Sequence, residues 1–216
     1  MTHVWVRAEQ RDNETRVGGT PEGVAKLVAA GITVTVEDSP TRCITTDKYA
    51  AAGAAIAPTH SWPEAPEDSI IFGLKELPED GSALPHRHIM FGHAFKGQPA
   101  GQRLLRRFGA GSGTLFDLEY LVDADNRRVA AFGYWAGYAG AAVTLKCWIA
   151  QQKGHIANPV APYPSSNHLL ADLQSDLVDT GTHRPTALII GALGRVGTGA
   201  ADLCTAMGVP TARWDM

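Results

Sequence analysis

The chain has 216 residues, of which 44% are hydrophobic, and a formal net charge of −3 at pH 7. This length and composition are sufficient for one large or two small domains with a hydrophobic core. The charges are mixed, without a long run of either sign, which argues against nucleic acid or an anionic membrane as a partner and leaves small polar substrates open.

The first half of the chain alternates between strand-like and helix-like segments. Thr20 can cap a helix and Pro21 suits its first position, while Gly31 allows a left-handed stop. The expected strands are His3–Val6, Ile32–Val36, Ser69–Gly73, His88–Phe91 and an edge segment at Gly113–Glu119, and the expected helices are Thr20–Ala30, Asp47–Ala54 and Gly97–Phe108. This alternation predicts an α/β fold with a mostly parallel sheet, in a Rossmann-like N-terminal substrate and catalytic domain over residues 1–128.

Residues 129–216 are expected to form a connecting helix and the first part of a second Rossmann domain that binds a dinucleotide. The helix covers Val129–Ala150, where Lys146 and several tyrosines argue against a membrane span. The segments expected after it are a stiff loop at Pro159–Ser166, a helix at Leu169–Asp179, a turn at Gly181–Pro185, and strands at Ala187–Ile190 and Pro210–Trp214.

A glycine-rich turn, GALGRVGTG, follows the strand that ends at Ile190 and opens a helix. In this context a glycine turn brings backbone N–H groups close to a pyrophosphate. The match to GxGxxG is imperfect, because Ala192 occupies the first glycine position. Asp215 follows the next strand and could accept hydrogen bonds from ribose hydroxyls, which favours NAD over NADP. The alternative is a turn that serves only tight packing. The expected cofactor-binding residues are Gly191, Gly194, Arg195, Val196, Gly197 and Asp215.

Ionisable side chains follow two of the expected strands. Lys75 and Glu76 come directly after one strand, and His93 and Lys96 come after another. Sites of parallel α/β folds form at the carboxyl ends of strands. A lysine near a second cation, or desolvated in a cleft, can accept a proton near neutrality, where histidine also titrates. Amine oxidation and imine hydrolysis require these residue types, although Lys75 could also be an ordinary surface lysine.

Other charged residues allow a substrate with several carboxylates. Arg16 precedes the first helix and Arg128 precedes the long one, and a guanidinium binds a carboxylate through two hydrogen bonds. Glu119 could tune the charge of the cleft or form a structural ion pair. A metal held by His86, His88 and His93 is an alternative that we do not adopt, because no cysteine or carboxylate cluster completes it. We therefore expect no metal.

Three scattered cysteines without CxxC spacing argue against a disulfide framework and a zinc ribbon. The N-terminal sequence has no apolar signal segment. We therefore expect reduced thiols in a cytoplasmic protein.

Several long motifs carry a resemblance to a known family. They include VEDSP, SWPEAP, IIFGLKELPE, HRHIMFGHAFKGQ, GTLFDLEYL, RRVAAFGYWAGYAGAA and LIIGALGRVGTGA. Together, from Val4 to Asp215, the sequence resembles NAD-dependent, L-lysine-forming saccharopine dehydrogenases, which are related to alanine dehydrogenase and transhydrogenase. The resemblance implies reversible oxidative deamination of saccharopine, with NAD and water, to L-lysine and 2-oxoglutarate.

The resemblance also implies residue roles. Lys75 would take the proton of the secondary amine, and His93 would be the acid–base catalyst of imine hydrolysis. The residues implied around the substrate are Arg16, Glu76, Lys96, Glu119 and Arg128.

Members of this family continue for well over a hundred residues more, so the chain resembles a C-terminally truncated member. A dinucleotide fold that stops after two strands leaves a sheet edge and an apolar face uncovered, which favours a homodimer or a complementing C-terminal chain. Two alternatives stay open: a truncated, non-catalytic relative that binds or regulates, and a related amino-acid or imino-acid dehydrogenase.

Overall fold

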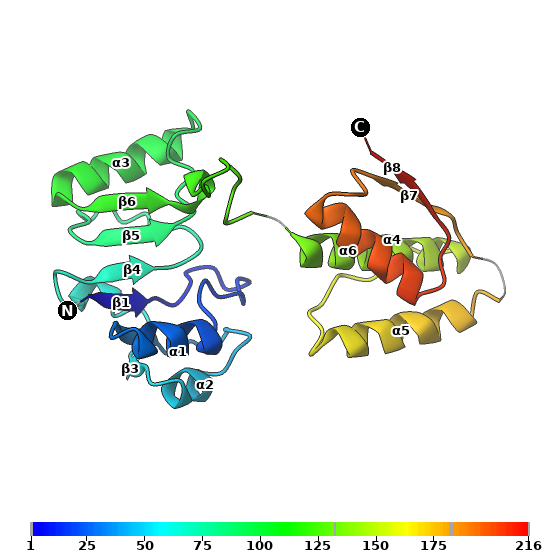
Figure 1. The fold of residues 1–216 in the computed structure, drawn as a ribbon, viewed down its shortest axis with the longest axis horizontal. Helices are drawn as coiled ribbons and strands as arrows, with labels where there is room; N and C mark the ends of the chain where they lie inside the picture. Colours follow the sequence, from blue (N-terminus) through cyan, green and yellow to red (C-terminus); the bar gives the residue numbers. More distant parts are fainter. Residues whose placement is uncertain (1, 132, 182–183, 216) are drawn as a thin grey trace. The chain divides into compact units, whose positions relative to one another are not determined.

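The computed structural model describes residues 2–131, 133–181 and 184–215, and the chain divides into two compact units, Met1–Ala130 and Ala131–Met216. Figure 1 shows a sheet flanked by helices in the first unit, and helices with a small sheet in the second. The turn expected at Gly181–Pro185 falls partly on residues 182 and 183, which lie outside the described residues.

A parallel sheet forms the centre of the first unit. Among the described residues it has six strands, in the spatial order β3-β2-β1-β4-β5-β6, and every neighbouring pair is parallel. The strands are β1 (His3–Val6), β2 (Thr33–Glu37), β3 (Ala55–Ala57), β4 (Ile70–Phe72), β5 (Arg87–Met90) and β6 (Thr114–Asp117). The helices are α1 (Pro21–Ala29), α2 (Thr46–Ala51) and α3 (Pro99–Gly111), with 3-10 turns η1 (Trp62–Glu64) and η2 (Leu118–Tyr120). The predicted α/β class is confirmed, and the strands' carboxyl ends share one edge.

Local signals fix the start and end of α1 as the sequence predicts. The Thr20 hydroxyl accepts the N–H of Gly23 at 3.2 Å, and Pro21 occupies the first turn. Gly31 follows the helix with φ +79°, a conformation that side chains disfavour. The chain can therefore turn directly into β2.

Apolar cores lie on both faces of this sheet, because alternate residues of a strand point to opposite faces. Val6 packs with Val24 of α1 in one core. Its neighbour Trp5 packs against the other core, which contains Ile71 of β4 and Phe108 of α3. Burial on both faces is typical of parallel sheets with helices on each side. The unit therefore leaves its strand ends, rather than its faces, for chemistry.

The second unit packs helices against a small parallel sheet. Its described elements are α4 (Tyr134–Gln152), α5 (Ser166–Val178), β7 (Ala187–Ile190), α6 (Arg195–Ala206) and β8 (Thr211–Trp214). The chain leaves β7, runs through α6 and returns in β8, parallel to β7. This is the β–α–β connection that begins a Rossmann fold. Of the helices that the structure describes, α4 included, none has the length and apolar character needed to cross a membrane.

Glycines allow α4 and α6 to touch backbone to backbone. A Cβ atom on Gly137 would collide with the carbonyl of Val196, and one on Gly199 would collide with the carbonyl of Tyr134. The core around this contact is built from α4, α5, β7 and α6, and Leu145, Leu173 and Leu203 lie in it. Its other buried members in these elements are Tyr138, Ala142, Ile149, Leu177, Ile189, Ala201 and Cys204. The small residues of the long helix thus serve helix packing.

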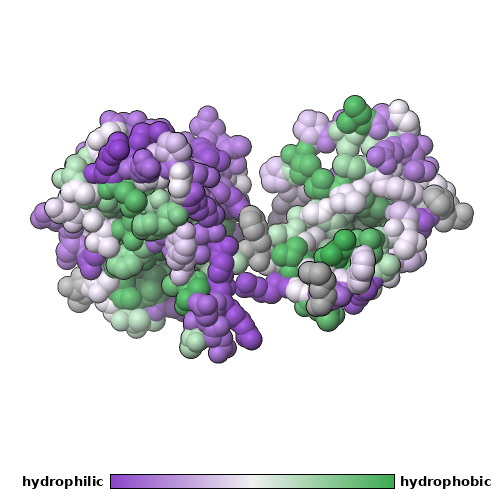
Figure 2. Space-filling model, turned by 90° about the horizontal axis from the view of Figure 1, so that it is seen from above, coloured by the Kyte–Doolittle hydropathy of each residue, from purple (hydrophilic) through white to green (hydrophobic). Residues whose placement is uncertain are grey.

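One face of the β7–β8 sheet is open. Ile189 is buried against the helices, whereas Leu188 and Ile190 are 60% and 69% exposed. Trp214 of β8 is exposed as well. Figure 2 shows hydrophobic side chains at the surface of this unit, between hydrophilic ones. The uncovered apolar face that the sequence predicts is therefore present.

Some element bounds differ from those expected. The helix predicted to reach Ala54 ends at Ala51, because Gly53 adopts φ +94°, and the short strand β3 follows unpredicted. The helix predicted from Val129 begins only at Tyr134, because the N–H of Val129 still bonds the carbonyl of Leu121 at 2.9 Å in an extended segment.

Candidate active site at the carboxyl edge of the sheet

Predicted site residues follow three neighbouring strands of the first unit. Lys75 and Glu76 follow β4, His93 and Lys96 follow β5, and Glu119 lies in η2, directly after β6. Because β4, β5 and β6 are adjacent and parallel, the loops that carry these residues lie along one edge of the sheet. This is the edge at which parallel α/β folds bind their ligands.

The Glu119 carboxylate contacts the side chains of three other residues that the sequence predicts for the site. Lys96 donates to Oε1 at 3.0 Å, Nη1 of Arg128 lies 3.2 Å from the same oxygen, and Nδ1 of His93 lies 3.5 Å from Oε2. The hydrogen bond from Lys96, and then the charges of Arg128, Lys96 and His93, lower the pKa of Glu119, although burial opposes them. The carboxylate is therefore ionised at neutral pH.

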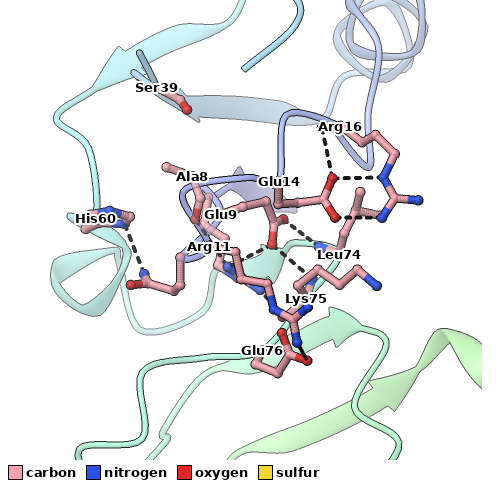
Figure 3. A network of polar contacts seen from close by, with 12 residues as sticks. Ala8, Glu9, Arg11, Glu14, Arg16, Ser39, His60, Leu74, Lys75 and Glu76 are labelled. Atoms are coloured by element: carbon pink, nitrogen blue, oxygen red, sulfur yellow. Dashed lines mark hydrogen bonds and ion pairs between the residues drawn. The ribbon is translucent and has the colours of Figure 1, made fainter. Parts of the chain in front are cut away.

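The loop that carries Lys75 is held by buried charges from the end of β1. The Glu9 carboxylate accepts the N–H groups of Leu74 and Lys75 at 2.7 and 2.9 Å (Figure 3). The buried guanidinium of Arg7 donates to the carbonyl of Lys75 and lies 3.4 Å from Glu9. Gly73 makes room for it, because a Cβ there would lie 2.5 Å from Cζ of Arg7. Among the described residues, the Lys75 ammonium itself makes no hydrogen bond or ion pair.

Arg16 is already engaged by a carboxylate. Its Nε and Nη2 donate to the two oxygens of Glu14 at 2.8 and 2.6 Å, and its backbone N–H adds a third bond at 3.0 Å. The hydrogen bond from Arg16 lowers the pKa of Glu14, which is itself buried. The guanidinium remains largely exposed, so its remaining edge is accessible.

Glu76 lies apart from the Glu119 cluster. Arg11 donates to its Oε1 at 2.6 Å, and both side chains are exposed (Figure 3). The structure thus brings His93, Lys96, Glu119 and Arg128 into contact, but gives Glu76 a different partner.

Two of the three histidines considered for a metal are core residues. Nε2 of His86 donates to the carbonyl of Ala65 at 3.1 Å, and His88 packs edge-on against Trp62 and Phe108. Burial, reinforced by the charge of Arg7, lowers the pKa of His88 to about 3, so this ring is neutral. Within the ranges that the structure describes, no three His, Cys, Asp and Glu residues are grouped to hold a metal.

Sequence analysis missed the residues that position the site. Glu9 lies in a sequence without any periodic signal, and Glu14 and Asp117 are equally inconspicuous. Asp117 offered one usable signal: it stands at the end of a strand, two residues before Glu119, where an Asp side chain can accept a backbone N–H. Its carboxylate accepts the N–H of Glu119 at 3.0 Å.

The glycine turn of the second unit has the backbone geometry of a close approach. Gly191 adopts φ +74°, and Gly194 caps α6. A Cβ on Gly197 would lie 2.6 Å from Cα of Ala192, so only glycine lets α6 pack onto the turn. The N-terminus of this helix, with its unsatisfied N–H groups and positive dipole, suits a pyrophosphate. These residues therefore fit a dinucleotide.

Asp215 lies directly after β8, beside the turn. Its Oδ2 accepts the N–H of Leu193 at 2.9 Å, so this acid holds the middle of the glycine turn. Trp214, the last residue of β8, accepts the N–H groups of Gly191 and Ala192 through its carbonyl. The strand pair and the turn therefore form one continuous hydrogen-bonded structure.

A family model described as "Alanine dehydrogenase/PNT, N-terminal domain" matches residues 5–139. The chain is 44% identical over 220 residues to a saccharopine dehydrogenase (NAD(+), L-lysine-forming) of Yarrowia lipolytica, covering 98% of this chain and 60% of that protein. The protein of the same name from Candida glabrata is 43% identical, with 98% and 59% covered. The chain thus spans about 60% of the length of these curated relatives.

Solved structures share the fold at lower identity. An L-alanine dehydrogenase has a TM-score of 0.66 at 20% identity, covering 96% of this chain and 53% of the other. A transhydrogenase from Sinorhizobium meliloti has a TM-score of 0.63 at 19% identity, covering 99% and 56%. At these identities the likeness concerns the fold alone.

Proposed function

The chain belongs to the alanine dehydrogenase/PNT N-terminal domain family, and from this premise we propose that it carries the catalytic residues of an L-lysine-forming saccharopine dehydrogenase. The observation that carries the proposal is the ionisable edge of the first unit, where Lys75 and His93 follow adjacent parallel strands. The similarity to relatives of that name over 98% of the chain supports it.

The proposed reaction is the oxidation of saccharopine with NAD and water to L-lysine, 2-oxoglutarate and NADH. NAD, when bound, would supply the hydride acceptor for the substrate carbon. Lys75 takes the proton of the secondary amine, which leaves an imine. His93 then takes one proton from the attacking water while Lys75 returns its proton to the nitrogen, which gives the carbinolamine. As the C–N bond breaks, His93 gives its proton to the departing nitrogen and the carbinolamine hydroxyl releases its proton to solvent. Both are proton transfers of the kind that a positioned lysine and histidine perform near neutrality.

The charged neighbours adjust these groups and hold the substrate. Glu119 lies 3.5 Å from Nδ1 of His93 and orients the ring, and Lys96 and Arg128 balance the negative charge of Glu119. Arg128 and the exposed edge of Arg16 can bind substrate carboxylates through paired hydrogen bonds. Glu76 adjusts the charge beside Lys75 only at longer range, because its carboxylate is paired with Arg11.

We assign the NAD site to the second unit. Gly191, Gly194, Arg195, Val196 and Gly197 would surround the pyrophosphate, and Asp215 would accept the ribose hydroxyls. The positive φ of Gly191 and the close approach at Gly197 support this assignment. The curated relatives are longer than this chain. We therefore propose that a complementing C-terminal segment or a second copy of the chain completes the nicotinamide pocket. Either partner could also cover the exposed Leu188 and Ile190.

The test is NADH formation from saccharopine, followed by absorbance, for the chain with and without a C-terminal segment supplied from a relative. We expect turnover with the segment, and its loss in Lys75→Met and in His93→Gln. Lys26→Met and His155→Gln are matched controls, because both residues are exposed and neither belongs to the site.

The outcomes separate the alternatives. Turnover of another amine in preference to saccharopine in a substrate panel would identify a related amino-acid or imino-acid dehydrogenase. Binding of NAD or lysine without turnover under every condition would favour a non-catalytic relative.

A further inference from the structure

We infer that Asp117 is a positioning residue that sets His93 against Glu119. The inference rests on the proposed function, in which His93 is the acid–base group. Its basis is the convergence of three backbone N–H groups, from both loops that carry these residues, on one carboxylate.

The Asp117 carboxylate lies between the loop after β5 and the turn after β6. Oδ1 accepts the N–H of Gly92 at 3.2 Å and the N–H of Glu119 at 3.0 Å, and Oδ2 accepts the N–H of Ala94 at 3.4 Å. The first and third donors flank His93 on either side. One short side chain therefore fixes the backbone around His93 and the backbone of Glu119 at the same time.

His93 needs such support because its backbone is in a disfavoured conformation. Its φ is +48°, in the left-handed region that non-glycine residues seldom occupy. Conformations of this kind persist only where the surroundings over-determine them, and they gather at functional sites. The ring also stacks on Phe91, with centroids 6.2 Å apart. Without the Asp117 bonds, the loop is free to relax and turn the ring elsewhere.

The result of this arrangement is a defined distance between the His93 ring and the Glu119 carboxylate. Nδ1 of His93 is buried and lies 3.5 Å from Glu119, while 39% of the side chain stays exposed. The groups that face Glu119 are His93, Lys96 and Arg128, and the two cations sit on long, flexible side chains. His93 has only two rotatable side-chain bonds, so its distance from Glu119 depends on the backbone that Asp117 holds.

The neighbouring loop is built in the same way. There Glu9 accepts the N–H groups of Leu74 and Lys75, as Asp117 accepts those of Gly92 and Ala94. Each catalytic loop is thus held by a carboxylate from an adjacent strand.

The test measures how strongly the His93 ring senses Glu119, by the NMR chemical shifts of the His93 ring at one fixed pH. In the parent chain, Glu119→Gln should move these signals, because it removes a negative charge 3.5 Å from Nδ1. In an Asp117→Ala background the same change should have about half the effect or less. Asp80→Ala is the control: Asp80 accepts the N–H of Ser82 and a hydrogen bond from Arg107, both at 2.9 Å, in a turn before β5 without contact to His93 or Glu119, so the full effect should remain.

An equal effect of Glu119→Gln in both backgrounds would overturn the inference. If Asp117→Ala does not fold, Asp117→Asn decides. The amide turns one acceptor oxygen into a donor while keeping the shape, so it should give an intermediate effect, and an unchanged effect would again reject the role.

Turnover supplies the second readout. In an active preparation, Asp117→Ala should lower kcat about 100-fold, with little change in KM, because a misplaced acid–base group leaves binding intact. An unchanged kcat would contradict the inference. Because the NMR coupling does not depend on turnover, a parent chain that stays inactive even with the C-terminal segment would reject the proposed function and leave the positioning test standing.

Discussion

Glu37 gives the sharpest stability prediction, because it is a completely buried carboxylate at the end of β2. Its Oε1 accepts the indole N–H of Trp5 at 3.0 Å and the backbone N–H of Trp62 at 2.6 Å. Its Oε2 accepts the backbone N–H groups of Ala8 and His60 at 2.7 and 3.0 Å. Replacement by glutamine should therefore destabilise the first unit strongly.

The magnitude follows from the number of donors. A glutamine keeps one oxygen, so the two donors on the other side lose their acceptor and face an NH2 group instead. A buried donor left unsatisfied costs about 1–3 kcal/mol, so two such donors cost about 2–6 kcal/mol. Because the loops can partly relax, we expect the free energy of unfolding to fall by about 3 kcal/mol. A loss of this size is at the high end for one substitution.

The assay is urea unfolding followed by tryptophan fluorescence. Trp5 and Trp62 both bond the Glu37 carboxylate and contribute to the emission together with the three tryptophans of the second unit, so the comparison with a control variant isolates the effect of Glu37. Glu64→Gln is the matched control, because this exposed carboxylate lies two residues from Trp62. If Glu37→Gln changes the free energy of unfolding by less than about 0.5 kcal/mol, the reasoning from unsatisfied donors is refuted.

Three further predictions concern the ion pair at Glu14 and two glycine contacts. The pKa of Glu14 is lowered from 4.5, chiefly by the hydrogen bond from Arg16, so its contribution to stability is present above 4.5 and is lost as the pH falls through the lowered value. Glu14→Gln should thus remove part of the acid-induced fall in the melting temperature, measured by thermal unfolding over that range. Gly199→Ala should lower the free energy of unfolding by about 1–3 kcal/mol, because its Cβ would meet the Tyr134 carbonyl. Gly140→Ala should leave the free energy of unfolding unchanged, because its Cβ meets open space. Chemical denaturation compares the two variants. Gly197→Ala should weaken NAD binding about tenfold by pushing α6 off the turn, measured by calorimetry on a preparation that binds NAD.

Signals from neighbouring residues were sufficient to predict most helices and strands, and where they failed there is a physical reason. The N-cap at Thr20 and the stop at Gly31 depend only on neighbouring residues, so the bounds of α1 follow from the sequence. The end of α2 depends on a left-handed Gly53, which the sequence permits but does not require. β3 has three residues, two of them alanine, and shows no alternating pattern that could reveal a strand.

The candidate site, too, is predictable from the sequence only in part. The placement of Lys75 and His93 follows from strand ends, which apolar patterns reveal. The bonds that hold them do not: Glu9 lies 65 residues from Leu74, and Asp117 lies 25 residues from Gly92. Such pairings exist only after the sheet has formed. The ion pair between Arg16 and Glu14 is local in sequence. A guanidinium can pair with any of many carboxylates, however, and the sequence does not show which one it contacts.

The strand order of the first unit raises the question of why we assign the dinucleotide to the second unit, since β3-β2-β1-β4-β5-β6 is the Rossmann order. Two features answer it. α1 begins at Pro21, far beyond the end of β1, so no tight turn brings a helix N-terminus to the strand end. Glu37 occupies the position where an acid would hold a ribose, but four protein donors already bind its oxygens. In the second unit, Gly194 caps α6 only a few residues after β7. We therefore propose that a β–α–β connection serves substrate chemistry in the first unit and dinucleotide binding in the second, and that the turn before the helix and the free or occupied state of the strand-end carboxylate make the difference.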